Sequence, residues 1–410
     1  MTPAAIKSDA LKSGALKSGP AASPAEIVAA IRSVVGPSEK PIGLHEPKFT
    51  GNEWAYVKEC LDTGWVSYNG AYVAKFEQML CDITGAASCA AVANGTVAIE
   101  IALRVAGVKA GDEVLSPSLT FVATNNAIAH VDAVPHFVDS DAATLGIDPA
   151  ALADYLKDIA EPIEGGARNR LTGRRLAAIL PMHCFGHPVD MDALNELAAR
   201  WKIPVIEDAA EAIGSSYKGR PAGSLAPIAA MSFNGNKIVT TGGGGAILSR
   251  DPEVGKRIRY LTTTAKQPHP WEFIHDEIAW NFRLPNINAA MGCAGLEQLD
   301  ELLAAKRKLQ QRYESVFAAA PGVSVFREAE GSRSNYWLSA LLLDSPDLAL
   351  RDSVLQACHD AGLLTRAAWR LSHHLPMYRD NPRMPLDVAE RLQPRIINLP
   401  SSPFLGRALA

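Results

Sequence analysis

The sequence has no excess of basic charge, and this absence argues against one class of function. Its 410 residues include 40 Lys and Arg against 44 Asp and Glu, so the formal net charge at pH 7 is -4. Proteins that bind nucleic acid neutralise several phosphates with clustered Lys and Arg side chains. We therefore expect no nucleic-acid partner, although a ligand the size of a nucleotide needs only a local positive site.

Long apolar runs and cysteine motifs are also missing. No stretch of about 18 uncharged apolar residues is present, so we expect no membrane span, and the N-terminus lacks the apolar segment of a secretion signal. The six cysteines are scattered and form no C-x-x-C pair or ligand cluster. This distribution is typical of reduced thiols. Together these absences predict a cytoplasmic protein.

The length and composition predict a globular protein with more than one domain. Hydrophobic residues make up 48% of the chain and charged residues 20%, which is close to the average for globular proteins. Residues 1–24 are rich in Ala, Ser and Pro, and we predict a disordered N-terminal extension there. We assign residues 25–285 to a large domain and residues 286–410 to a smaller α+β domain.

From about residue 50, short apolar runs alternate with amphipathic helical segments. This alternation predicts an α/β domain with a mostly parallel sheet, in which ligands bind beyond the carboxyl ends of the strands. The predicted strands cover residues 88–92, 113–115, 134–138, 176–181, 204–206, 229–233 and 246–249. The smaller domain is predicted from a helical stretch at 287–317, a strand at 336–343 and a helix at 351–361.

Two strand ends carry the most specific chemical signal. Asp208 follows the strand at 204–206, and Lys237 follows the strand at 229–233 within the sequence S-F-N-G-N-K. A partly desolvated lysine amine can hold an aldehyde cofactor as a Schiff base. A carboxylate at a strand end can pair with the pyridinium nitrogen of pyridoxal phosphate. Taken alone, Asp208 would also fit a helix N-cap and Lys237 a solvated turn, so the pair is more informative than either residue.

A phosphate group would need a binding site of its own. The sequence Asn94-Gly95-Thr96 predicts a turn from a strand into a helix with exposed N–H groups, and Ser232 lies at the end of another predicted strand. Backbone N–H groups at the start of a helix bind anions. Alone, this turn would equally be an ordinary helix cap.

Three other patterns fail to match known catalytic or binding motifs. The glycine run at 242–245 does not complete the G-x-G-x-x-G fingerprint of dinucleotide binding, because an apolar residue stands where the last glycine should be. His183 and His187 are four residues apart, but in a predicted strand and loop they would not share a helix face, so we predict no metal site. The segment 214–218 lacks the final glycine of a nucleophile elbow.

In combination, the motifs resemble the pyridoxal-phosphate (PLP) sugar aminotransferases of the DegT/DnrJ/StrS type, which have the aspartate-aminotransferase fold, PLP fold type I. The resemblance extends from about residue 44 to residue 403. It is sharpest in E-D-A-A-E-A at 207–212, S-F-N-G-N-K at 232–237 and N-F-R-L-P-N-I at 281–287. It implies an α/β large domain with a mostly parallel sheet and a smaller C-terminal domain.

The resemblance also implies roles for individual residues around the cofactor ring. Lys237 would be the catalytic residue, which binds the cofactor covalently and moves the proton. Asp208 would contact the pyridine nitrogen, and Phe121 would stack on the ring. Glu211 occupies the place where the family has Gln or Glu near the 3-hydroxyl group.

The cofactor phosphate would be shared between two subunits. Gly95, Thr96 and Ser232 would bind it from one subunit, and Asn281 of the partner subunit would reach the same phosphate. This arrangement implies a homodimer with shared active sites.

For the substrates, the resemblance implies an amino acid donor, L-glutamate by preference, and a nucleotide-linked 4-keto-6-deoxy sugar that is aminated at C4. The expected product would serve bacterial surface glycan or nonulosonic acid biosynthesis, and the closest resemblance is to the legionaminic-acid branch. We expect the substrate to be bound by Tyr68, His183, Arg283 and His374.

Two alternatives remain at this stage. One is a regulator or sensor that binds PLP without turnover, and the other is an NAD-dependent sugar oxidoreductase. The sequence shows no added DNA-binding domain for the first and no dinucleotide fingerprint for the second. A lysine at position 237 favours amino transfer, because family members that act as dehydratases carry histidine there.

Overall fold

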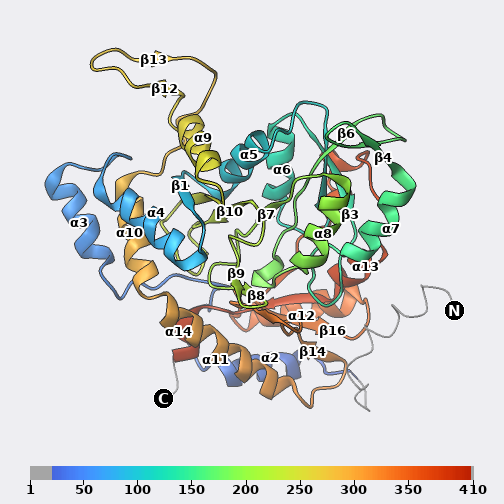
Figure 1. The fold of residues 1–410 in the computed structure, drawn as a ribbon. Helices are drawn as coiled ribbons and strands as arrows, with labels where there is room; N and C mark the ends of the chain where they lie inside the picture. Colours follow the sequence, from blue (N-terminus) through green and yellow to red (C-terminus); the bar gives the residue numbers. More distant parts are fainter. Residues whose placement is uncertain (1–20, 408–410) are drawn as a thin grey trace.

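The computed structural model describes residues 21–407 (Figure 1). The extension predicted over residues 1–24 therefore lies outside the described residues, except for its last four. Within those four, Ala22 is buried and Ser23 caps helix α2 (Pro24–Val35). The Ser23 hydroxyl accepts a hydrogen bond from the Glu26 N–H, and the Glu26 carboxylate accepts one from the Ser23 N–H, a capping box that fixes the start of the helix.

The central sheet has the mostly parallel topology that the sequence predicts. Its strands are β1 (Ser88–Val92), β2 (Glu113–Pro117), β3 (Val134–Val138), β6 (Arg175–Ile179), β7 (Ile206–Asp208), β10 (Ile228–Ser232) and β11 (Gly245–Ser249). The spatial order of these strands is β3-β2-β6-β7-β10-β11-β1, with β6 and β7 joined by backbone bridges. The antiparallel strands β5 (Gly166–Asn169) and β4 (Ala160–Ile163) also join this sheet, at the start of β6. The pairs β2–β3, β2–β6 and β7–β10 are parallel, whereas β11 is antiparallel to both of its neighbours.

Helices cover both faces of this sheet because successive strand residues point to opposite sides. In β11, Ile247 packs into a cluster with α5 and α9, and Leu248 packs into the cluster on the opposite face. One face is covered by α5 (Gly95–Val105), α6 (Val122–His130) and α9 (Pro252–Thr262). The other is covered by α4 (Ala71–Thr84), α7 (Pro149–Ile159), α8 (Met191–Trp201) and α10 (Asn286–Glu297). The strands are buried on both faces, which explains their nearly continuous apolar sequences.

A second, antiparallel sheet lies below the first in Figure 1. Its order is β14 (Val323–Val325), β16 (Ser339–Leu343), β18 (Ile396–Leu399) and β17 (Arg366–Ala367). Apolar residues of α2, α11 (Leu299–Phe317) and α12 (Leu348–Asp360) pack with this sheet in one buried cluster. The N-terminal helix α2 therefore packs with C-terminal elements. The division into residues 25–285 and 286–410 stays a prediction.

Two predicted elements of this region differ in the structure. The helical stretch at 287–317 consists of α10 and α11, which meet at Gln298. They separate because α10 packs against α4 and α3 (Glu53–Thr63), whereas α11 packs against α2 and β14. The strand predicted at 336–343 begins only at Ser339, because Tyr336 has a left-handed φ of 49°, which a strand does not allow.

A hairpin protrudes from the described part of the chain. The hairpin of β12 (Lys266–Gln267) and β13 (Ile274–His275) extends away from the body next to α9 (Figure 1). Around it, Trp271, Phe273 and Ile278 are 81%, 78% and 90% exposed.

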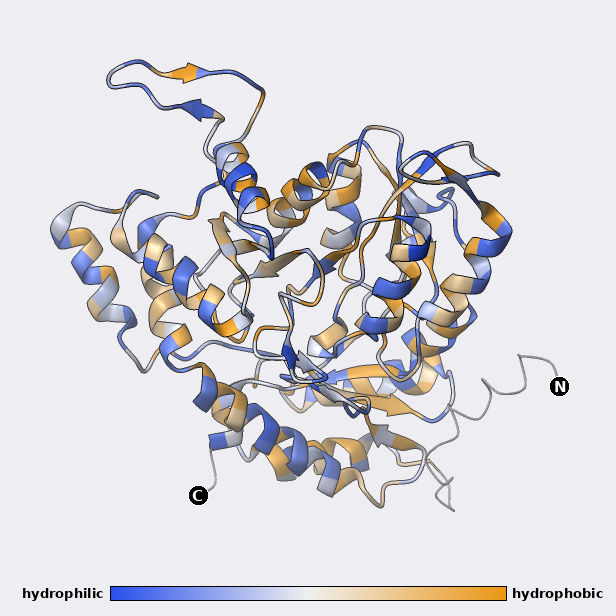
Figure 2. Ribbon diagram, viewed as in Figure 1, coloured by the Kyte–Doolittle hydropathy of each residue, from blue (hydrophilic) through white to orange (hydrophobic). Residues whose placement is uncertain are grey.

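Hydropathy follows the layers of the fold. Figure 2 shows mainly hydrophobic residues in the central sheet and both kinds of residue along peripheral helices such as α11. Within residues 21–407, none of the helices has both the length and the apolar character that crossing a membrane requires.

Candidate active site

A cavity of about 320 Å³ lies where the parallel strands end, between the central sheet and the C-terminal residues Trp337 and Trp369. The parallel pairing of β7 with β10 sets Asp208 opposite Ala230, so that Ser232 and the turn to Lys237 follow at the same edge. Seven of the eight predicted cofactor-binding residues line this cavity: Gly95, Thr96, Phe121, Asp208, Glu211, Ser232 and Lys237. The remaining residue, Asn281, lies elsewhere.

Lys237 places its amine inside the cavity wall. A short turn follows β10, in which the Lys237 N–H donates a hydrogen bond to the Asn234 carbonyl (2.9 Å). The side chain is only 11% exposed, and Nζ lies 3.2 Å from Glu211 Oε1 and 3.8 Å from the centre of the Trp337 ring. The amine is therefore partly desolvated and faces the cavity, as a lysine that binds an aldehyde must.

Asp208 ends β7 with its side chain buried beneath the same cavity. Its Oδ2 accepts a hydrogen bond from the Thr124 hydroxyl (2.8 Å), and Oδ1 accepts one from the Ala210 N–H (3.1 Å). Burial raises the pKa of Asp208, while those two hydrogen bonds and the positive charge of Lys237 oppose the rise. A cationic ring nitrogen would give this buried carboxylate the charged partner that favours its ionised form.

Glu211 faces Lys237 from the loop after β7. Its Oε2 accepts a hydrogen bond from the Phe185 N–H (2.9 Å), and its Oε1 lies near the lysine amine. Burial raises the pKa of Glu211 to about 7, although the nearby Lys237 charge acts to lower it. A carboxyl group with this pKa can change its protonation near neutral pH.

The start of α5 fits a phosphate group. Asn94 caps the helix, since its Oδ1 accepts a hydrogen bond from the Val97 N–H (3.0 Å). The N–H groups of the first helical turn have no partners within the helix, and the helix dipole favours an anion there. A Cβ atom on Gly95 would lie 2.8 Å from Ser232 Cβ, so only glycine lets the helix start approach the end of β10 so closely.

Aromatic side chains form another part of the cavity wall. Phe121 is 49% exposed, which is unusual for a phenylalanine, and its ring centre lies 6.2 Å from that of Trp369. An exposed ring beside the lysine and the phosphate site fits stacking on a flat heterocycle. The donor set, the anion site and this ring together fit PLP.

Among the lining residues to which sequence reasoning gave no role in the site, three have prominent contacts there. Thr124 holds Asp208, and Trp337 and Trp369 come from segments that are remote along the chain. The sequence offered one signal for Thr124: its hydroxyl lies in the first turn of the helix that follows Phe121. No local pattern identifies the two tryptophans, because their places depend on how the C-terminal segments pack against the central sheet.

Two predicted substrate-binding residues, His183 and Arg283, do not line this cavity, and their substrate-binding roles stay predictions. His183 is fully buried; its Nε2 donates to Glu207 Oε1 (3.0 Å), and its Nδ1 accepts from the Val189 N–H (3.2 Å). Both nitrogens are occupied, so no donor or acceptor is left for a substrate. Arg283 is buried as well, and pairs with Glu77 (2.5 Å) beside β1.

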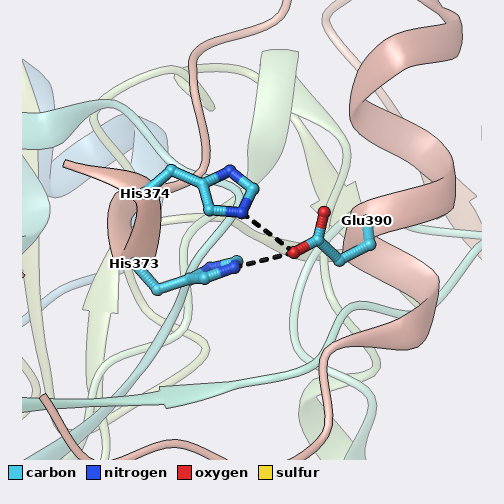
Figure 3. Close-up of side chains that lie close together, drawn as sticks. All are labelled: His373, His374 and Glu390. Atoms are coloured by element: carbon cyan, nitrogen blue, oxygen red, sulfur yellow. Dashed lines mark hydrogen bonds and ion pairs between the residues drawn. The ribbon is translucent and has the colours of Figure 1, made fainter. Parts of the chain in front are cut away.

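His374 and Tyr68 also lie outside the cavity. His374 belongs to the short helix η2 (Ser372–His374), where its Nε2 lies 3.1 Å from Glu390 Oε1 (Figure 3). Tyr68 is half-buried in the loop between α3 and α4. Their substrate-binding roles stay predictions that this arrangement does not support.

The group around His374 has the residue types of a metal site. In the part of the chain that the structure describes, His373, His374 and Glu390 are the one set whose ligand atoms converge in this way. His373 Nε2 also lies 2.8 Å from Glu390 Oε1, and its Nδ1 lies 2.7 Å from the Ser118 hydroxyl. Hydrogen bonds therefore account for the geometry, and the adjacent surface carries Arg370, Arg379 and Arg383.

The fold and this site define a PLP-dependent aminotransferase of fold type I. Residues 47–409 match the model of the DegT/DnrJ/EryC1/StrS aminotransferase family, and the chain belongs to that family. This membership favours an enzyme over a regulator without turnover and over an NAD-dependent oxidoreductase.

Several individual proteins of known name are similar to this chain. The chain is 36% identical to GDP-perosamine synthase of Escherichia coli O157:H7, over 90% of this chain and 95% of the relative. It is 35% identical to GDP-perosamine synthase of Caulobacter vibrioides, with the same coverage. The crystal structure of the aminotransferase TlmJ from Streptoalloteichus hindustanus superimposes with a TM-score of 0.79 at 28% identity, over 88% of this chain and 93% of that one. These relatives do not support the predicted legionaminic-acid branch.

Proposed function

We propose that the protein transfers an amino group from L-glutamate to C4 of a nucleotide-linked 4-keto-6-deoxy sugar. The observation that carries this proposal is the shared cavity, in which the Lys237 amine, the Asp208 carboxylate and the anion site at Gly95 line one space. These are the three groups that a PLP-dependent transfer requires: an amine for the aldehyde, an acid for the ring nitrogen and donors for the phosphate.

Each residue has a task that its surroundings allow. When bound, PLP supplies an electron sink for the carbanion that forms when the donor loses its α-proton. Lys237 Nζ takes that proton and later returns one, which general acid–base catalysis requires of a group near the reacting carbon. Asp208 binds and orients the ring nitrogen, and Thr124 holds the Asp208 carboxylate in place.

The names of the relatives suggest which nucleotide the sugar substrate carries. Two of them are named for making GDP-perosamine, and the chain covers 95% of each. We therefore propose a GDP-linked sugar as the acceptor and a role in glycan biosynthesis. This proposal takes the place of the predicted legionaminic-acid branch, which these relatives do not support.

A substrate panel tests this proposal. We expect GDP-linked 4-keto-6-deoxy sugar to be aminated in the presence of glutamate, with one 2-oxoglutarate formed for each amino sugar. The products would be identified by mass spectrometry and NMR, with UDP- and TDP-linked sugars as parallel acceptors and Lys237→Ala as the control enzyme. Preference for another nucleotide would refute the GDP assignment. Absence of an amino sugar from every acceptor would refute the function.

We further propose that the active unit is a homodimer with shared sites. Asn281 is exposed at the base of the β12–β13 hairpin and does not line the cavity of its own chain. The exposed apolar residues Trp271, Phe273 and Ile278 on the same protrusion are typical of a surface that a second subunit covers. Asn281 of the partner subunit would then complete the phosphate site.

Mixing two inactive variants tests this arrangement. Lys237→Ala and Asn281→Ala subunits, unfolded and refolded together, should form heterodimers in which one of the two sites has both native residues. Random pairing then makes about a quarter of all sites native, so activity should rise toward that fraction of wild type. Activity equal to the mean of the two separate variants would contradict a shared site.

A further inference from the structure

The amine of Lys237 lies between two different groups. Glu211 Oε1 is 3.2 Å from Nζ, and the face of the Trp337 ring is 3.8 Å from Nζ, measured to the ring centre. Trp337 is 5% exposed, so water has little access to this contact. A cation over an indole face is attracted by the negative face of the ring, and the attraction is stronger when both groups are desolvated.

Hydrogen bonds hold Trp337 on several sides. Its Nε1–H donates to the Asn236 carbonyl (2.8 Å), and its backbone N–H donates to Asn335 Oδ1 (2.8 Å). Its carbonyl accepts a hydrogen bond from the buried Lys306 amine (2.9 Å). The indole is therefore anchored to the residue that precedes Lys237, and its orientation toward the amine is fixed.

Asn335 connects the two groups that face the amine. It is almost fully buried, and its Nδ2 donates to the Glu211 carbonyl (2.8 Å) while its Oδ1 accepts from the Trp337 N–H. A Cβ atom on Gly186 would lie 1.8 Å from Asn335 Oδ1, so a glycine at position 186 is what admits this side chain. Glu211 and Trp337 thus belong to one connected arrangement around Lys237.

Other charged or titratable groups interact with the amine from other parts of the chain. Asp208 interacts electrostatically with Lys237 from the end of β7, and His45 does so from the segment before α3. Burial, with the positive charges of Lys306 and Lys237, lowers the pKa of His45 well below its usual value. Burial also lowers the pKa of Lys306. Histidine and lysine carry no negative charge, so Glu211, Asp208 and the indole face are the groups here that attract the charged amine.

We propose that Trp337 is a positioning residue for Lys237, whose indole face holds the amine in the ammonium form that it has after it takes the donor's proton and before it returns one. The inference rests on the proposed function, because amino transfer detaches Lys237 once in each half-reaction. An aromatic face attracts the charged amine but offers no oxygen to take its proton. Trp337 therefore keeps Nζ beside Glu211 while the proton stays available for transfer.

The test measures the titration of Lys237 itself. Full-length cofactor-free protein is labelled with an amine-reactive reagent over a pH series, and the labelled peptide that contains Lys237 is quantified by mass spectrometry. In Trp337→Leu we expect the midpoint of labelling to fall by about one pH unit, because the indole no longer stabilises the ammonium form. In Trp337→Phe the fall should be smaller. Trp201→Leu, on the remote helix α8, should leave the midpoint unchanged.

A second measurement uses enzyme whose bound cofactor carries the amino group. After glutamate has converted the cofactor to its amine form, the same labelling series should show the same order of midpoints, and kcat should fall about tenfold in Trp337→Leu.

A midpoint in folded Trp337→Leu equal to that of wild type would overturn the proposal. If Trp337→Leu does not fold, Trp337→Phe decides: a lowered midpoint supports the proposal and an unchanged one refutes it. Failure of glutamate to convert the wild-type cofactor would refute the proposed function, whereas the cofactor-free midpoints test Trp337 independently.

Discussion

Lys237→Ala is expected to reduce amino transfer by at least about 10²- to 10⁴-fold, the usual contribution of a positioned acid–base group. The substitution removes both the amine that binds the cofactor and the group that moves the proton from the donor. Nζ lies inside the cavity wall, and the described cavity holds no second lysine. The measurement is the rate at which glutamate converts the bound cofactor in a single turnover, followed by its visible absorbance.

The fold should survive this substitution. Removing Lys237 leaves Glu211 without its cationic neighbour, but burial already raises the pKa of Glu211 to about 7, and the loss of the lysine charge raises it further. The carboxyl group would then be neutral at pH 7, so no unpaired charge would remain buried. Lys157→Ala, on the exposed side of α7, is the matched control and should behave as wild type. Wild-type turnover in Lys237→Ala would refute the assigned role.

Asp208→Asn is expected to have the second largest effect. The amide keeps the shape of the side chain but cannot supply the negative charge that stabilises a protonated ring nitrogen. A hydrogen bond to a charged group is worth about 1.5–3 kcal/mol, which corresponds to a loss of roughly 10- to 150-fold in rate. Single-turnover kinetics with glutamate measure this loss separately from binding of the sugar.

Two further variants make this result specific. Asp154→Asn replaces an exposed carboxylate that pairs with Lys157 on α7, and should leave the rate unchanged. Thr124→Val removes the hydroxyl that donates to Asp208 Oδ2, and should cause a smaller loss than Asp208→Asn. A rate for Asp208→Asn within twofold of wild type would mean that this carboxylate does not contact the ring nitrogen.

The residues that sequence reasoning placed correctly in the cavity share one property. Asp208 and Ser232 end buried strands and Lys237 follows one, and parallel pairing of those strands brings their carboxyl ends to one edge. Gly95 and Thr96 follow β1 and open a helix, a pattern that is also local. For these residues the short-range sequence determines the position relative to the sheet.

The residues that were missed or misplaced depend on contacts between distant segments. Trp337 is held near Lys237 by residues that are distant in the sequence: Lys306 of α11 donates to its carbonyl, and the Asn236 carbonyl accepts from its Nε1–H. His183 follows a strand, as the active-site residues do, but its ring turns inward to Glu207 rather than outward to the cavity. Neighbouring residues in the sequence do not reveal which way such a side chain points.

The helices and strands also show that local sequence predicts an element better than it predicts the element's distant contacts. Strand β1 matches its predicted residues, because a short apolar run is followed closely by the turn residues Asn94 and Gly95. Helix α2 packs against α11 and α12, which are far away in the sequence, so its place in the fold has no local signal.

The most direct test of the central claim is reduction of the PLP-loaded protein with borohydride, followed by digestion and mass spectrometry. We predict that the cofactor mass is found on the peptide that contains Lys237 and that prior treatment with glutamate prevents its attachment. Cofactor mass on a different lysine, or none on the wild-type protein, would contradict the account.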